Sequence, residues 1–90
     1  MSICIAVFET TFETLRAEDF FRAGGVNFRP VLKPRKIGSA CRMALQFSTG
    51  EMEGAKAAVK EGNLALLAFY RKENGNWVKI DNPEFPPSAL

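Results

Sequence analysis

The stretch Ile3-Cys4-Ile5-Ala6-Val7-Phe8, followed at once by Glu9-Thr10-Thr11-Phe12-Glu13, decides how the fold begins. The run over 3–8 is apolar without a break and rich in β-branched side chains, which is typical of a strand buried on both faces. Thr10 with Glu13 three residues later forms a capping-box pattern, and this pattern predicts a helix directly after the strand. The chain therefore begins as a strand-helix unit.

Helical spacing of apolar side chains continues until Gly24-Gly25, where we expect the helix to end. We expect Phe12, Phe20 and Phe21 to lie in the core. The full apolar arc predicted for this helix consists of Phe12, Leu15, Ala17, Phe20, Phe21 and Ala23.

The rest of the chain adds further strands and one helix. A strand is predicted over 26–32, where Pro30 favours a sheet edge or a strand end, and another over 43–47 after a loop at 33–40. A second capping signal over 48–51 precedes a helix that Gly62-Asn63 closes. A strand over 64–70 follows, and Asn74-Gly75 indicates a type I′ hairpin turn into a short strand at 77–80.

The order strand-helix-strand-strand-helix-strand is the split βαβ pattern. We predict the α+β class, with a ferredoxin-like βαββαβ antiparallel sheet, two helices on one face and a C-terminal β-hairpin extension that starts at residue 71. Residues 1–81 are expected to form a single domain, followed by a Pro-rich irregular tail over 82–90.

Composition agrees with one small domain in the cytoplasm. The 90 residues are 47% hydrophobic and 24% charged, with a net charge of +2. No apolar run approaches the roughly 18 residues of a membrane span, and the start of the chain does not resemble a secretory leader. We therefore predict cytoplasmic localisation and no membrane partner.

The chain has no histidine, and this absence removes several chemistries. Ser-His-Asp and Cys-His catalytic sets, His-ligated zinc and His acid-base catalysis all require that residue. The sequence contains no evident metal-ligand cluster and no phosphate-cradling glycine loop. We therefore expect neither autonomous catalysis nor a resident metal or cofactor.

Cys4 and Cys41 are the only cysteines, too few for a disulfide scaffold. Cys4 lies in the first apolar run and is expected to be a buried hydrophobic residue. Cys41 lies in a basic part of the chain, because residues 20–50 contain six Lys or Arg and no Asp or Glu.

The predicted topology places the loop before Cys41 at the same end of the sheet as the start of the first helix. We expect an unshielded sulfur there, held as a thiolate by cations and by the helix N-terminus, and able to carry transient sulfide, selenide or persulfide. The residues expected to bind an anion or stabilise the thiolate are Thr10, Thr11, Arg35, Lys36, Gly38, Ser39 and Arg42.

Two segments resemble the selenium/sulfur (Se/S) carrier-like domain family. These are Phe8-Glu9-Thr10-Thr11 and the stretch Lys33-Pro34-Arg35-Lys36-Ile37-Gly38-Ser39-Ala40-Cys41, followed by Ala44-Leu45-Gln46-Phe47. The resemblance covers roughly residues 3–70, and the Pro-Arg-x-Ile-x-Ser-x-Cys pattern is its most specific part. It implies binding or relay of reduced sulfur or selenium at Cys41, with a donor or acceptor protein as partner. A glycine usually follows the cysteine in that family, whereas Arg42 stands there in this chain.

Two other function classes stay open from the residues alone. The basic loop and helix start could hold an anionic ligand without using Cys41. Nucleic acid is disfavoured as that ligand, because the loop lacks interleaved aromatic residues and the net charge is small. Alternatively, the domain could be an assembly module that forms a homodimer through a sheet edge or the Trp77 hairpin.

Overall fold

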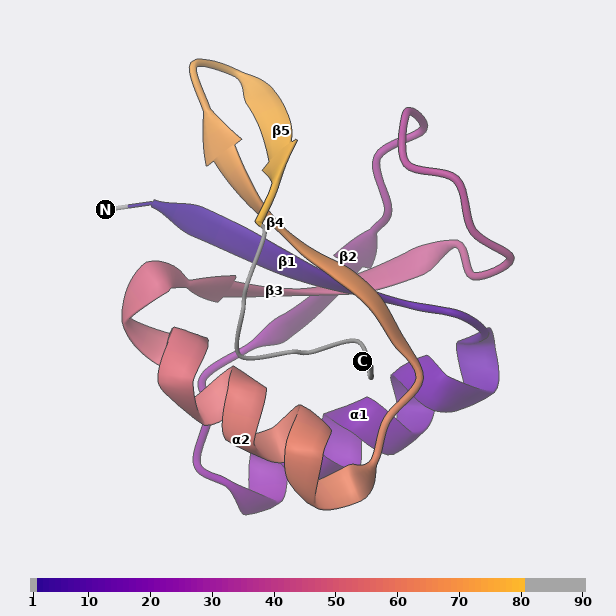
Figure 1. Ribbon diagram of the computed structural model, residues 1–90, viewed down its shortest axis with the longest axis vertical. Coiled ribbons are helices and arrows are strands. Elements are labelled where there is room, and N and C mark those ends of the chain that lie inside the picture. Colours follow the sequence, from indigo (N-terminus) through magenta and orange to yellow (C-terminus); the bar gives the residue numbers. More distant parts are fainter. Residues whose placement is uncertain (1, 81–90) are drawn as a thin grey trace, which may run out of the picture.

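The computed structural model describes residues 2–80 (Figure 1). The strands are β1 (Ile3–Phe8), β2 (Arg29–Leu32), β3 (Met43–Ser48), β4 (Leu66–Glu73) and β5 (Asn76–Lys79). The helices are α1 (Thr11–Ala23) and α2 (Met52–Gly62), with a short 3-10 turn over Thr49–Glu51 before α2. The predicted tail over 82–90 lies outside the described residues.

The strands form one antiparallel sheet in the order β2-β3-β1-β4-β5. The predicted α+β class with an antiparallel sheet and two helices is confirmed. The sheet differs from the predicted four-strand arrangement, because β4 runs on to Glu73 and pairs directly with β5. The hairpin is therefore an edge of the sheet rather than an appendage. The turn is as predicted, with Asn74 at φ 51° and Gly75 at φ 81°.

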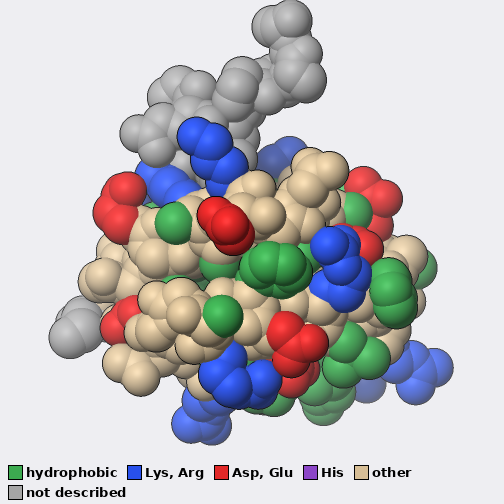
Figure 2. Space-filling view, turned by 90° about the horizontal axis from the view of Figure 1, so that it is seen from below, with side chains coloured by type: hydrophobic (Ala, Val, Ile, Leu, Met, Phe, Trp, Pro, Cys, Tyr) green, Lys and Arg blue, Asp and Glu red, His purple; other side chains and the backbone are tan. Residues whose placement is uncertain are grey.

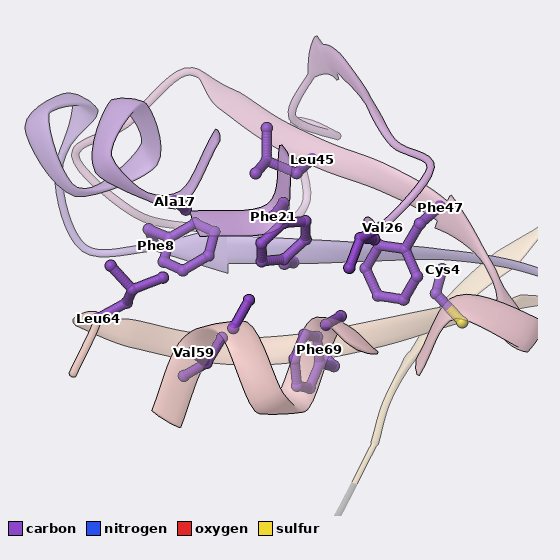
Figure 3. Packing of buried hydrophobic residues seen from close by; sticks show 13 residues of the cluster. Cys4, Phe8, Ala17, Phe21, Val26, Leu45, Phe47, Val59, Leu64 and Phe69 are labelled. Atoms are coloured by element: carbon purple, nitrogen blue, oxygen red, sulfur yellow. The ribbon is translucent and has the colours of Figure 1, made fainter. Parts of the chain in front are cut away.

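Both helices pack on the same face of the sheet, below it in Figure 1. Phe21 occupies the centre of this core, with Phe8 and Phe47 beside it (Figure 3). Its ring makes edge contacts with Phe8, Phe28 and Phe47 at centroid distances of 6.5, 5.6 and 6.1 Å. Val59 of α2 belongs to the same cluster. Burying one such aromatic ring stabilises the fold by about 1.5–3 kcal/mol, so this face supplies much of the domain's stability.

The inner face of α1 differs from the predicted apolar arc. Its fully or nearly fully buried residues are Thr14, Ala17 and Phe21, which are spaced three and four apart on one side of the helix. Phe12 and Leu15 point away from this side and are 68% and 56% exposed, so their predicted burial is wrong. A polar residue thus occupies an inward position where the sequence suggested only apolar ones.

The two capping predictions have different outcomes. Thr10 caps α1, since its Oγ1 accepts from the Glu13 amide at 3.1 Å. The second signal precedes a helix as predicted, but the cap does not form. Ser48 makes no side-chain cap, and Glu51 Oε1 instead accepts from the Asn27 amide at 3.2 Å. Glu51 therefore ties the start of α2 to the segment that follows α1.

Within the described residues, no helix covers the opposite face of the sheet. A small cluster of Ile5, Val7, Ala44 and Ile37 is buried there, with Trp77 among the residues packed against it. Ile37 comes from the β2-β3 loop, so this loop folds over the sheet face that the helices leave open. No helix within 2–80 is long and apolar enough to cross a membrane.

Candidate functional site

Cys41 lies at the end of the β2-β3 loop, just before β3. The Lys33 amide donates to the Arg42 carbonyl at 2.7 Å and closes the neck of this loop. Ser39 Oγ accepts from the Cys41 amide at 3.2 Å and donates to the Cys41 carbonyl at 3.0 Å. Lys33 Nζ donates to the Ile37 carbonyl at 2.6 Å. The backbone around Cys41 is therefore fixed on both sides.

The sulfur of Cys41 points into the protein and is 0% exposed. Thr14 Oγ1 lies 3.1 Å from it, and the Met43 amide donates to it at 3.3 Å. The sulfur also lies 3.4 Å from the Met43 carbonyl, to which a protonated thiol can donate. The prediction that small neighbours leave the sulfur unshielded is wrong, because the thiol turns toward α1 and away from Gly38-Ser39-Ala40.

The Thr14 hydroxyl has one hydrogen and two acceptors within reach. Thr14 Oγ1 lies 3.1 Å from the Thr10 carbonyl and 3.1 Å from Cys41 Sγ. When Cys41 is a thiol, Thr14 can donate to Thr10 while the thiol donates to Thr14 or to the Met43 carbonyl. When Cys41 is a thiolate, the same hydroxyl can turn its hydrogen to the sulfur. The pair can thus satisfy either protonation state without moving a heavy atom.

These contacts set the protonation of Cys41. Burial is the largest single influence and by itself raises the pKa of the thiol. Hydrogen bonds to Thr14, to the Met43 backbone and to the Thr11 hydroxyl oppose it, together with the charge of Lys33. Their sum exceeds the effect of burial, so the pKa of Cys41 lies below the ordinary cysteine value. Cys41 is therefore a buried thiol that ionises more readily than an ordinary cysteine.

The first turn of α1, which carries Thr14, is fixed by its own polar contacts. Glu13 Oε1 accepts from the Ala65 amide at 2.9 Å, and Arg16 donates to both oxygens of Glu13 at 2.9 and 3.0 Å. Arg16 also donates to the Gly62 carbonyl at 2.9 Å. The hydrogen bond from Ala65, reinforced by Arg16 and opposed by some desolvation, lowers the pKa of Glu13. This network ties the start of α1 to the end of α2 and so positions Thr14 against Cys41.

Cys4 has the opposite character. It is 0% exposed in the main core, and it forms no disulfide with Cys41. Burial raises the pKa of its thiol, against weaker lowering effects of the Thr49 hydroxyl and the Arg71 charge. The prediction of a buried hydrophobic residue is confirmed.

A family model with the description "Putative Se/S carrier protein-like" matches residues 3–71 of the 90-residue chain. The chain belongs to this family. The matched range includes α1, the β2-β3 loop and Cys41, and it ends within β4. No curated protein and no solved structure matches the chain.

In this Se/S carrier-like chain the predicted site residues divide into three groups. Thr11 belongs to the Cys41 site through its hydroxyl, and Ser39 holds the Cys41 backbone. Thr10 reaches the site only indirectly, as the cap of α1 and through its carbonyl. The other four make no hydrogen bond to the sulfur within the described structure: Arg35, Lys36, Gly38 and Arg42.

The predicted source of positive charge therefore needs a correction. Lys33 is the cation that lowers the pKa of Cys41, whereas Arg35, Lys36 and Arg42 are exposed side chains without that effect. The reason is geometric: Lys33 lies at the neck of the loop beside β3, while Arg35 and Lys36 lie beyond it on the open sheet face. Proximity in sequence is a poor guide to distance within a long loop.

Besides Lys33, Thr14 and Met43 are the site residues that sequence reasoning missed. Thr14 is the only buried polar or charged residue among residues 2–80, and it interrupts the inward stripe of α1. A threonine at an inward helical position was the signal that could have identified it. Met43 acts through its backbone, which leaves no signal in residue type.

Proposed function

We propose that this protein carries sulfur or selenium covalently on Cys41 and passes it between partner proteins. The observation that supports this proposal most directly is the contact between Thr14 Oγ1 and Cys41 Sγ at 3.1 Å inside the fold. A structural cysteine needs no hydroxyl and no backbone donor on its sulfur, whereas a carrier thiol needs groups that stabilise its thiolate. Membership of the Se/S carrier-like family adds independent support.

The proposed transfer step is an exchange with a persulfide donor. The Cys41 thiolate attacks the outer sulfur of a donor persulfide, R–S–SH, and forms Cys41–S–SH. The S–S bond of the donor breaks, and its electron pair leaves on the donor as R–S⁻. One S–S bond forms as one breaks, so no external oxidant or reductant is required. Selenium follows the same path when the donor carries R–S–SeH.

Because Cys41 is fully buried, transfer requires the β2-β3 loop to move away from the sulfur. Ser39 and Ile37 hold this loop closed, the first by hydrogen bonds and the second by burial against the sheet. The closed state shields a bound persulfide from water and from other thiols. The open state presents it to a partner.

The proposed partner docks beside the start of α1. Phe12 and Leu15 are exposed there, within the same two turns that carry Thr14. Figure 2 looks onto the helical face and shows hydrophobic side chains exposed among charged ones. A donor protein that covers Phe12 and Leu15 would bring its own sulfur close to the loop that shields Cys41.

Several further elements belong to the same proposal. The protein acts in the cytoplasm, where its two unpaired cysteines stay reduced. It has neither catalytic activity of its own nor a resident cofactor, and the chemistry is supplied by the donor and acceptor proteins. Strands β2-β3-β1-β4 constitute a ferredoxin-like core to which β5 is added. The homodimer stays a prediction from the sequence.

The test uses two matched single-cysteine variants. Cys4→Ala keeps Cys41, and Cys41→Ser keeps Cys4. Each is incubated with glutathione persulfide, and its intact mass is measured with and without later reduction. We expect one reducible sulfur adduct on Cys4→Ala and none on Cys41→Ser. Equal labelling of both variants, or of neither, would overturn the proposal.

A further inference from the structure

The open face of the sheet contains a groove that the Cys41 site does not use. It has a volume of about 550 Å³, which lies within the range of small-molecule sites, roughly 300–1,000 Å³. One wall is the β2-β3 loop with Arg35 and Lys36, and the other is the β4-β5 hairpin with Tyr70, Asn76 and Trp77. In Figure 1 the loop and the hairpin both rise from the sheet on the side away from the helices.

The strand register places further cations on the same face. Lys79 pairs with Tyr70, and Lys72 pairs with Trp77, so both lysines lie on the face that carries the two aromatic rings. Lys72 Nζ lies 5.5 Å from the centroid of the Trp77 ring. Arg29 belongs to this face as well, because its partner Gln46 is paired with Ile5 of the open-face cluster.

Within the five strands, no carboxylate lies beside these cations on the open face. Glu73 is the only acidic residue within the five strands, and alternation places it with Arg71 on the helical side, where the two form an ion pair. None of the residues that line the groove is acidic. The helical face in Figure 2 differs, since acidic and basic side chains are interspersed on it. The positive charge is thus concentrated beside the two half-buried aromatic rings.

We propose that this groove binds a nucleotide unit, with its base against Trp77 and Tyr70 and its phosphate on Arg35 and Lys36. An anion alone would need the cations but not the two half-buried rings, and an apolar ligand would need the rings but not the cations. A nucleotide needs both, because its base stacks on aromatic side chains while its phosphate pairs with Arg or Lys. The Asn76 amide can hydrogen-bond to a base edge.

The structure removes the main argument against such a ligand. From the sequence, the lack of aromatic residues in the basic loop and the small net charge both disfavour nucleic acid. The fold supplies the missing rings from the hairpin, more than thirty residues further along the chain. The bound unit is a nucleotide, either free or part of a single strand. The two sources differ in how many of the five cations on this face they contact, namely Arg29, Arg35, Lys36, Lys72 and Lys79.

Trp77 is the only tryptophan in the chain, so its fluorescence reports directly on the groove. The full-length protein is titrated separately with adenosine 5′-monophosphate, adenosine, inorganic phosphate and an oligoadenylate of about eight nucleotides. Calorimetry provides a second measurement that does not depend on the fluorophore. Two double variants are compared: Arg35→Ala/Lys36→Ala at the groove, and Arg22→Ala/Lys60→Ala, which removes the same charge from the helices. Circular dichroism checks that both are folded.

We expect the monophosphate or the oligoadenylate to change Trp77 fluorescence saturably, and adenosine and phosphate to bind at least about tenfold more weakly. The groove variant should lose about tenfold in affinity and the helix variant little. An oligoadenylate that binds more tightly than the monophosphate identifies a single strand as the ligand, and equal affinity identifies a free nucleotide. Phosphate binding as tightly as the monophosphate, equal losses in the two variants, or no binding would overturn the proposal. Cys41→Ser should bind normally, so this result is independent of the carrier test.

Discussion

Replacing Thr14 by valine should make the Cys41 thiolate less stable. Valine has nearly the shape of threonine, so the packing of α1 is kept while the hydroxyl 3.1 Å from the sulfur is lost. A hydrogen bond to a charged group contributes about 1.5–3 kcal/mol, but the hydroxyl must first give up its neutral bond to the Thr10 carbonyl, worth about 1 kcal/mol. The net loss to the thiolate is therefore about 1 kcal/mol, or roughly a fivefold lower ratio of thiolate to thiol at a given pH. The Thr10 carbonyl keeps the Thr14 amide as a donor, so no buried acceptor is orphaned.

The assay is the ultraviolet absorbance of the thiolate as a function of pH, measured in a Cys4→Ala background. Absorbance needs no reagent to reach the buried sulfur, so it reports on the closed state. Cys41→Ser provides the baseline, and Thr14→Ser is the matched control that keeps the hydroxyl. Thr14→Val should titrate at higher pH than the parent protein, and Thr14→Ser close to it. If Thr14→Val titrated like the parent, Thr14 would be a packing residue only, and the argument from this contact would fail.

The same substitution should change how stability depends on pH. The pKa of Cys41 is lower in the folded protein than in the unfolded chain, so the unfolded chain binds more protons between the two values. Stability from this group is therefore fully present above the unfolded pKa and is lost as the pH falls through the folded pKa. Denaturant unfolding of the Cys4→Ala protein should show this gain at alkaline pH, and Thr14→Val should reduce it.

Three further outcomes follow from the described contacts. Ile37→Ala should destabilise the protein by about 2–4 kcal/mol and accelerate alkylation of Cys41, because a buried anchor of the loop is lost. Unchanged alkylation would show that the loop does not control access of reagents to Cys41. Glu13→Gln should weaken the dependence of stability on pH in the acid range. The lowered pKa of Glu13 gives stability that is lost as the pH falls through its folded-state value. An unaltered acid unfolding curve would contradict this. Gly62→Ala should destabilise the protein by about 1–3 kcal/mol despite the better helix propensity of alanine, because its Cβ would lie 2.8 Å from the Phe20 ring. In the control Gly50→Ala, the new Cβ meets nothing closer than 3.9 Å. This control should be tolerated in the same denaturant titration.

Local sequence patterns determined the elements of this fold. The apolar run before Thr10, the cap that Thr10 provides and the turn at Asn74-Gly75 depend on residues close together in the chain, and the structure has all three. Pro30 lies on an edge strand, as its missing amide hydrogen requires. These features follow from steric and hydrogen-bonding preferences that act over a few residues.

Contacts between distant residues were decided only by the tertiary structure. Thr14 and Cys41 are 27 positions apart. Only the packing of α1 beside the start of β3 reveals that a hydroxyl, rather than the neighbouring arginines, contacts the sulfur. The extension of β4 into the hairpin brings Trp77 opposite Arg35 and Lys36. The sequence by itself determined that Cys41 stands in a cationic loop near a helix start. The register of the strands and the path of the loop decided which side chains reach it, because side-chain direction depends on alternation along each strand and cannot be inferred from distance along the chain.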